Sequence, residues 1–329
     1  MRLRPRQIEG RPSTELRRLL REENWPIVSI GGATCHHAQL AEATGFKVFA
    51  LSGSQASAHI LGLPDAGLMT MSEVIDNARH ICQAVSIPVM ADCETGFGNV
   101  LNATRAVSDM IDAGVAGLFI EDQVFPKRCG FTKGLEIIPT ADVVGKLRAA
   151  LAVRADLDPD VVIMARTDSR ACVGGGMDEV LRRCEAYLKA GVDMLMITAL
   201  QSREEIATVR RAFPEAVMQL NISGIDPPIT QAEFQEFGIA LVDVSISKVA
   251  QIMMYDFLTK LKSGGIDVFN EFTQKNKQHP IGIFGFLELT GFPKLLEIER
   301  AFLNPDDLAK YEQSIGLYDP RAKGSKAAE

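Results

Sequence analysis

The sequence lacks any apolar run long enough to cross a bilayer, for which about 20 residues are needed, so we expect no membrane span. Its opening residues, MRLRPRQIEGRPSTELRRLLREE, lack the apolar centre of a secretory signal, and their acids and few serines disfavour a transit peptide. Cysteine is sparse, since six residues scattered over a chain of 329 do not resemble a disulfide framework. We therefore expect a cytoplasmic protein with reduced thiols.

A surplus of basic residues is missing too. The formal net charge is −7, which argues against a general nucleic-acid-binding surface. What the chain does have is apolar residues, which make up 47% of it and are enough for one large core. An α/β barrel of this length is commonly a single domain.

Eight short apolar segments alternate with segments of helical pattern. They predict strands at 26–32, 47–54, 87–91, 117–120, 161–168, 192–198, 216–221 and 239–245. The segments between them predict helices at 35–44, 73–85, 100–113, 141–155, 178–190, 204–212 and from 231. This alternation predicts a (β/α)8 TIM barrel, an α/β fold whose active site lies at the carboxyl ends of the strands. A further helix, up to about residue 23, is expected to dock on the rim.

After residue 262 the pattern changes to helical segments without further strands. We therefore expect a barrel with its N-terminal helix over 1–262 and a helical C-terminal extension over 263–329. Within the extension, GIFGFLELTGFPKLLEIERAF (282–302) is apolar enough to need a covering surface, such as a neighbouring subunit. The final residues, AKGSKAAE, predict a disordered tail.

Acidic residues gather near the predicted strand ends. Asp92 and Glu94 alternate beyond the third strand, Glu121 ends the fourth, and Asp65 lies in the loop after the second. Carboxylates that converge on one point repel one another unless a cation lies between them. Oxygen ligands without a nearby histidine suit Mg²⁺ or Mn²⁺. Each acid alone could instead cap a helix or be solvated, but their placement at adjacent strand ends favours a metal site.

A basic loop that carries a thiol follows the fourth predicted strand. The stretch GLFIEDQVFPKRCGFTKG (117–134) leaves the strand and passes through Lys127, Arg128, Cys129 and Gly130. Adjacent cations are expected to lower the pKa of Cys129 and make it a usable acid or base. The other cysteines are interpreted as small buried hydrophobes.

Two further groups suit an anionic ligand. The backbone N–H groups of Ser52, Gly53 and Ser54 could hold a carboxylate. Arg166, at the end of the fifth predicted strand, suits a bidentate grip on a carboxylate. Arg166 could equally form a structural salt bridge with Glu121 or Asp168, or do both.

The motifs LSGS, LGLPD, ADCETGFGN, GLFIEDQVFPKRCG and MARTD occur in this order between about residues 25 and 260. In this combination the chain resembles the isocitrate lyase / phosphoenolpyruvate mutase superfamily, and most of all its short lyases, such as the 2-methylisocitrate and 2,3-dimethylmalate lyases. The resemblance implies a Mg²⁺-dependent barrel assembled as a homotetramer, a dimer of dimers. Its subunits would exchange a C-terminal helix, which would cover the apolar segment 282–302.

The resemblance also implies roles for individual residues. The metal would be held, directly or through water, by Asp92, Glu94, Glu121 and Asp65. The α-keto-acid half of the substrate would lie on Ser52, Gly53 and Ser54, with Arg166 neutralising its oxygens. Asn221 would contact the distal carboxylate. A gating loop, with Cys129 as the catalytic acid, would be formed by Lys127, Arg128, Cys129 and Gly130.

The chain departs from the lyases on the substrate side. Phe131 stands where they have His after the loop glycine, and Glu94 stands where Asp is usual. Thr198 ends the sixth predicted strand, where Glu is common. Asp243 lies in the eighth, where many members have Pro and oxaloacetate hydrolases have Ser. Thr198 and Asp243, together with Gly130 of the loop, are counted among the candidate substrate-binding residues.

From these features we expect a Mg²⁺-dependent carbon–carbon lyase. It would cleave a 2-hydroxy-dicarboxylate to an α-keto acid, pyruvate or glyoxylate, plus a carboxylic acid by retro-aldol (Claisen-type) chemistry. The alternatives on the same frame are oxaloacetate hydrolysis or decarboxylation and phosphonate chemistry. Phosphonate-acting members generally lack the loop cysteine, although one phosphonomutase branch carries KRCG. A non-catalytic barrel that binds a keto acid is a further alternative, and the intact Cys129 disfavours it.

Overall fold

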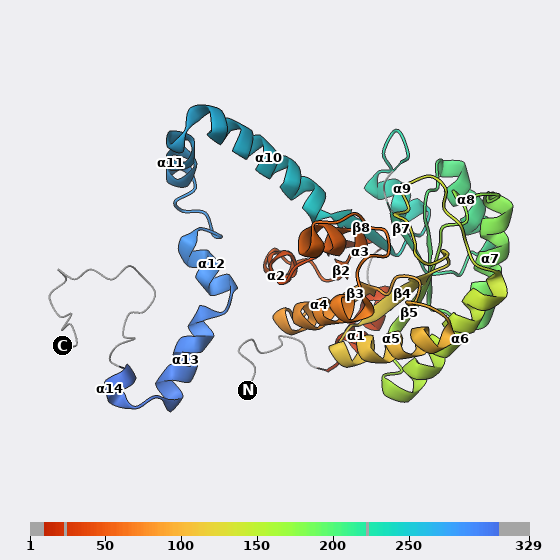
Figure 1. The fold of residues 1–329 in the computed structure, drawn as a ribbon, viewed down its shortest axis with the longest axis horizontal. Coiled ribbons are helices and arrows are strands. Elements are labelled where there is room, and N and C mark those ends of the chain that lie inside the picture. The colour runs from red at the N-terminus through yellow and green to blue at the C-terminus, as the bar shows by residue number, and fades with distance from the viewer. Residues whose placement is uncertain (1–9, 23–24, 222–223, 309–329) are drawn as a thin grey trace. The chain divides into compact units, whose positions relative to one another are not determined.

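The computed structural model describes residues 10–22, 25–221 and 224–308. Eight parallel strands pair in chain order, and β8 pairs with β1, so the sheet closes into a barrel (Figure 1). The strands are β1 Ile27–Gly32, β2 Phe49–Leu51, β3 Val89–Asp92, β4 Gly117–Glu121, β5 Val162–Thr167, β6 Met194–Ile197, β7 Met218–Asn221 and β8 Leu241–Ser245. The predicted (β/α)8 TIM barrel is confirmed.

Helices connect the strands and surround the barrel (Figure 1). They are α2 Cys35–Ala43, α3 Gly53–Ala56, the π-helix η1 Ser57–Leu61, α4 Met71–Ala84, α5 Val100–Ala113, α6 Thr140–Leu157, α7 Met177–Ala190, α8 Arg203–Ala212 and α9 Gln231–Glu236. Helix α4 begins with a capping box, in which the Thr70 hydroxyl accepts from the Glu73 N–H and the Glu73 carboxylate accepts from the Thr70 N–H. A cap of this kind fixes where the loop after β2 ends.

The first helix, α1 Pro12–Glu22, closes the amino-terminal end of the barrel. Its Leu16 and Leu19 are almost fully buried and pack with the methionines inside the barrel. Burying each leucine contributes about 1.5–3 kcal/mol. Arg17 donates to the carbonyl of Val161 and to Asp193, which precede β5 and β6. With this end closed, only the carboxyl ends of the strands are left for a site.

The predicted strand at 47–54 differs most from the structure. Strand β2 ends at Leu51 rather than at residue 54, and Ser52 then precedes helix α3. The reason lies in a neighbouring strand, because the Gly53 N–H donates to the carboxylate of Asp92. This long-range hydrogen bond turns the backbone away from the sheet, and the sequence pattern around LSGS does not reveal it.

A buried polar network joins the ends of β4 and β5 to α7. Asp122, directly after β4, accepts hydrogen bonds from the Thr167 hydroxyl at 2.6 Å, the Tyr187 hydroxyl at 2.9 Å and the Arg183 guanidinium at 3.1 Å. Its other oxygen accepts from the Asp168 N–H at 2.9 Å. The network fixes the backbone beside Glu121 and Arg166, which are candidate site residues.

Beyond β8 the described chain is helical, with α10 Ile246–Gly264, α11 Ile266–Lys275, α12 Ile283–Leu289, α13 Phe292–Phe302 and α14 Pro305–Leu308. The structure divides into two compact units within α10, after Met253, whereas we placed the boundary at 262. Several apolar side chains of the second unit are exposed, among them Tyr255 and Phe302. Helix exchange between subunits stays a prediction, and the predicted disordered tail lies outside the described residues.

Among the described residues, none of the helices is both long enough and apolar enough to span a membrane.

Replacing Arg183 with Met is expected to lower the free energy of unfolding by about 3–5 kcal/mol, because it leaves the buried Asp122 carboxylate without its cation. Arg182→Met is the matched control, since the Arg182 guanidinium pairs with Glu179 at an exposed position and should cost about 0–1 kcal/mol. Urea unfolding of both variants measures the difference. Equal losses would show that the Asp122 network contributes little.

Candidate active site

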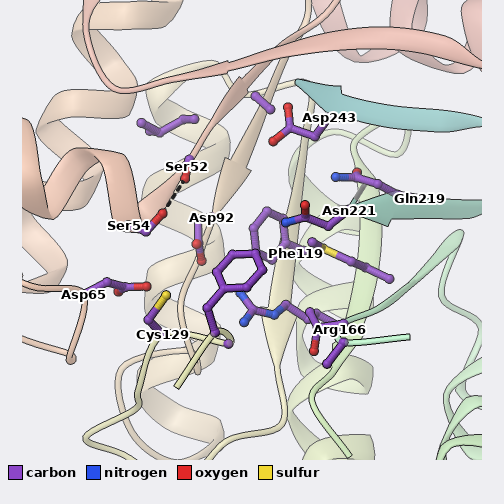
Figure 2. Close-up of a pocket in the computed structure, with 17 residues that line it drawn as sticks. Ser52, Ser54, Asp65, Asp92, Phe119, Cys129, Arg166, Gln219, Asn221 and Asp243 are labelled. Atoms are coloured by element: carbon purple, nitrogen blue, oxygen red, sulfur yellow. Dashed lines mark hydrogen bonds between the residues drawn. The ribbon is translucent and has the colours of Figure 1, made fainter. Parts of the chain in front are cut away.

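The candidate active site is a cavity of about 80 Å³ at the carboxyl ends of the strands (Figure 2). Residues that the sequence had suggested contribute much of its wall, namely Ser52, Ser54, Asp65, Asp92, Cys129, Gly130, Arg166, Thr198, Asn221 and Asp243. They come from seven segments that are far apart in the chain and meet because parallel strands end at one rim.

Asp92, the last residue of β3, is held in place by backbone donors. Its Oδ1 accepts from the Glu94 N–H at 2.8 Å, and its Oδ2 accepts from the Gly53 N–H at 3.1 Å. Position 53 needs glycine, because a Cβ there would lie 2.6 Å from Asp92 Oδ2. Each carboxylate oxygen has a second lone pair, so Asp92 can still bind a cation at the cavity.

Lys127 lies among the acids that the sequence had grouped. Its Nζ is 2.6 Å from Oδ1 of Asp65 and 2.9 Å from Oε2 of Glu94, and its side chain is buried. Burial by itself lowers the pKa of Lys127, but the carboxylates of Asp92, Glu121, Glu94 and Asp65 outweigh burial and raise it. The structure therefore gathers all four acids around one positive charge, and that charge belongs to the chain itself.

Glu94 occupies a strained position beside Asp92. Its φ of 53° lies in the left-handed region, which a non-glycine residue adopts at a cost of about 1–3 kcal/mol. The backbone is held there because the Glu94 carbonyl accepts from the Glu121 N–H at 3.0 Å. Burial and the nearby charge of Asp92 raise the pKa of Glu94 to about 7, although Lys127 opposes them. Backbone strain of this kind is typical of functional sites.

Arg166, on β5, forms the salt bridges that the sequence had left as an alternative. Its Nη1 lies 2.8 Å from Oε2 of Glu121, and its Nη2 donates to Oδ1 of Asp168 at 3.0 Å. Burial alone lowers the pKa of Arg166, but Asp168, Glu121 and Asp92 outweigh it and raise the pKa. The guanidinium also faces the cavity, so it neutralises buried acids and presents positive charge to a ligand.

The loop after β4 brings the half-buried Cys129 to the cavity wall. We predicted that adjacent cations lower its pKa, and this is wrong, because burial raises it and the Asp65 carboxylate adds to the rise. Lys127 and Arg166 oppose the rise without overcoming it, and both cations also pair with carboxylates. A thiol with a raised pKa keeps its proton at neutral pH, which suits an acid rather than a base.

Arg128 is anchored through its backbone rather than through its side chain. Its N–H donates to Gln123 Oε1, and its carbonyl accepts from Gln123 Nε2, both at 2.9 Å. The residue is exposed and does not line the cavity, so its predicted catalytic role stays a prediction. Phe131, two residues beyond Cys129, lies at the cavity edge with 70% of its surface exposed.

The opposite wall is formed by β6, β7 and β8. The Thr198 hydroxyl donates to Asp168 at 2.6 Å, whereas Asn221 and Asp243 lie side by side in register on the last two strands. The sequence reasoning missed Gln219, a buried residue of β7 that also lines the cavity. The signal in the sequence was an amide between the apolar Met218 and Leu220 of this strand.

The residues fit a small divalent cation. The cavity offers carboxylate oxygens from Asp65 and Asp92 and hydroxyl oxygens from Ser52 and Ser54, and Oε1 of the buried Glu121 accepts no hydrogen bond from the part of the chain that the structure describes. No group of three or more acidic, cysteine or histidine side chains within 10–22, 25–221 and 224–308 is already arranged as a metal site. Asp92 lines the cavity, and its role as a metal ligand stays a prediction.

Comparisons with known proteins agree with this architecture. The family model described as phosphoenolpyruvate phosphomutase matches residues 32–262. The 2,3-dimethylmalate lyase of Eubacterium barkeri is 34% identical over 284 residues, which are 84% of this chain and 93% of that protein. The 2-methylisocitrate lyase of Escherichia coli K12 is 39% identical over 236 residues, which are 70% of this chain and 77% of that protein.

Solved structures extend the likeness to three dimensions. A crystal structure of 2,3-dimethylmalate lyase matches with a TM-score of 0.81 and 27% identity over 94% of this chain and all of that one. Phosphonopyruvate hydrolase in complex with oxalate and Mg²⁺ matches with a TM-score of 0.77 and 27% identity over 90% of this chain and all of that one. Oxaloacetate acetylhydrolase matches with a TM-score of 0.75 and 26% identity over 88% of this chain and 96% of that one. The chain belongs to the phosphoenolpyruvate mutase / isocitrate lyase superfamily.

Proposed function

We propose that the protein is a Mg²⁺-dependent carbon–carbon lyase that cleaves a 2-hydroxy-dicarboxylate to an α-keto acid, pyruvate or glyoxylate, and a carboxylic acid. The observation that carries the proposal is the thiol of Cys129 facing the same cavity as Asp92 and Arg166. Binding a keto acid needs no proton donor, whereas retro-aldol (Claisen-type) cleavage leaves a fragment that must be protonated. The 2,3-dimethylmalate lyase and the 2-methylisocitrate lyase described above support this choice.

The substrate's 2-hydroxy-acid half would bind between the β2 loop and Arg166. The hydroxyls of Ser52 and Ser54 lie 3.1 Å apart at the cavity wall and can donate to its carboxylate. Arg166 would neutralise the oxygens from the other side. Asp92 would hold Mg²⁺, or Mn²⁺, with Glu94, Glu121 and Asp65 reaching it through water. When bound, the metal supplies Lewis-acid polarisation of the substrate oxygens.

Cleavage requires two proton movements. The hydroxyl loses its proton as its oxygen becomes the carbonyl of the α-keto acid, and the electrons of the C–C bond pass to the departing fragment as an enediolate. Cys129 then gives its thiol proton to the carbon of that fragment. The raised pKa of Cys129 favours this role, because the thiol is protonated before the reaction. Closing the loop that carries it would exclude water, which would otherwise protonate the fragment.

Oxaloacetate hydrolysis is the second candidate. Phe131 stands where the lyases have a histidine, and the loss of this polar group from the loop favours hydrolysis. The barrel also matches the fold of oxaloacetate acetylhydrolase. The two reactions differ in their products, since hydrolysis gives oxalate and acetate.

A substrate panel tests the proposed function. With Mg²⁺ present, 2-methylisocitrate or 2,3-dimethylmalate is expected to yield an α-keto acid, measured by mass spectrometry. Oxalate and acetate from oxaloacetate, without cleavage of either hydroxy acid, would favour the second candidate. Binding of pyruvate without turnover of these acids or of phosphonates would indicate a non-catalytic barrel.

Cys129→Ser is expected to lower kcat by about 10²–10⁴, because a serine hydroxyl is a much weaker acid than a thiol. Mg²⁺ binding, measured by calorimetry, should not change. Cys172→Ser is the matched control, since this half-exposed thiol lies outside the cavity and should leave turnover intact. Near-wild-type turnover by Cys129→Ser would remove the thiol from the mechanism.

Asp92→Asn is expected to abolish stabilisation by Mg²⁺, because an amide replaces the charged ligand at the cavity. For the wild type, Mg²⁺ at 100 times its Kd should raise the free energy of unfolding by about 2.7 kcal/mol. Asp112→Asn, at an exposed position on α5, is the control and should respond like the wild type. Thermal unfolding with and without Mg²⁺ measures the effect, and an unchanged response of Asp92→Asn would place the metal elsewhere.

A further inference from the structure

The Asp243 carboxylate has space at the cavity beside two small residues, Gly31 and Ala50. It lies in the middle of β8, and its Oδ2 occupies the space over Gly31 of β1, where a Cβ would be only 2.6 Å away. The neighbouring β2 presents Ala50 to the same cavity. Figure 2 shows Asp243 across the cavity from Cys129.

The other acids at this end of the barrel are compensated. Asp65 and Glu94 pair with Lys127, whereas Glu121 and Asp168 pair with Arg166. Asp92 accepts two backbone N–H donors. Asp243 accepts only from the Ser29 hydroxyl, at 3.2 Å, and forms no ion pair within the part of the chain that the structure describes. It is thus the cavity acid with most freedom to take up a proton.

The surroundings of Asp243 leave its charge uncompensated. The flanking strands β1 and β7 contain no ionisable residue, and the charged or titratable groups across the cavity are Asp65, Asp92, Cys129 and Arg166. Burial raises the pKa of Asp243 to about 7, and the Ser29 hydrogen bond opposes this only in part. A carboxyl group near pH 7 can both accept a proton and release it again.

Gln219, on the same wall of the cavity, also has an acceptor that a ligand could use. It is 3% exposed, lines the cavity, and its Oε1 accepts no hydrogen bond from the described residues. A buried amide oxygen without a donor costs about 1–3 kcal/mol unless a ligand or water supplies one. Gln219 and Asp243 together present acceptors toward the cavity, which suits a ligand that brings a hydroxyl group.

On the basis of the proposed function, we propose that Asp243 is the general base that takes the proton from the substrate's hydroxyl group. The O–H electron pair forms the new carbonyl, the C–C bond electrons leave with the enediolate, and the Cys129 thiol protonates that fragment at carbon. One proton thus moves to Asp243 and one leaves Cys129. When the products depart, Asp243 releases its proton to solvent and Cys129 regains one, which restores both groups.

Turnover of the hydroxy acid cleaved by the wild type provides the first test. Asp243→Asn should lower kcat/KM by about 10²–10⁴ and remove the rise of kcat/KM with pH through about pH 7. Ser29→Ala removes a hydrogen bond that lowers the pKa of Asp243, so this rise should move to higher pH. Formate should restore part of the activity of Asp243→Ala, because a small carboxylate can enter the vacated space. An Asp243→Asn enzyme with wild-type kcat/KM and pH profile would overturn the assignment.

Ligand binding provides a test that needs no turnover. In the presence of Mg²⁺, calorimetry compares malate, which carries a hydroxyl, with oxalate, which does not. Asp243→Ala should weaken malate binding by about tenfold and leave oxalate binding unchanged. Equal effects on both ligands, in a variant whose thermal unfolding matches the wild type, would contradict the inference. If the wild type cleaves no hydroxy acid, the proposed function fails and the assignment of Asp243 as the base fails with it. Weaker binding of malate alone by Asp243→Ala would still identify Asp243 as the acceptor of the ligand's hydroxyl group.

Discussion

The site depends on the balance between buried carboxylates and the two cations placed among them. Lys127 lies against Asp65 and Glu94, and Arg166 lies against Glu121 and Asp168. An unpaired buried ion costs several kcal/mol, so neither cation can leave without a replacement. Because Lys127 belongs to the loop that carries Cys129, the charge balance also determines where the thiol lies. The residues proposed as metal ligands, anion-binding group and proton donor are therefore parts of one electrostatic unit.

Small residues and backbone groups give that unit its shape. Gly53 lets a backbone N–H approach Asp92, and Gly31 leaves the space that Asp243 fills. The left-handed backbone at Glu94 connects β3 to the start of the site, and its carbonyl is held by the Glu121 N–H. At the opposite end of the barrel, the leucines of α1 fill the interior. The scaffold is thus packed at one end and polar at the other, as the barrel fold favours.

The sequence predicted most of the architecture, because buried parallel strands leave an apolar pattern and the acids stand directly after them. It also grouped Asp92 with Glu94, Glu121 and Asp65, since adjacent strand ends must meet. The contacts made across the barrel were not visible. Lys127 appeared as one member of a basic loop, and only the fold shows it buried among acids. The direction of the Cys129 pKa shift was missed for the same reason, because burial depends on packing that spacing does not encode.

We propose that one cavity holds a metal-bound α-keto acid within reach of the Cys129 thiol. A crystal structure of the wild-type protein with Mg²⁺ and pyruvate tests it most directly. We expect a metal ion on Asp92, with the pyruvate carboxylate at the Ser52–Ser54 turn and its oxygens facing Arg166. A structure in which saturating Mg²⁺ and pyruvate leave this cavity filled with water alone would contradict it.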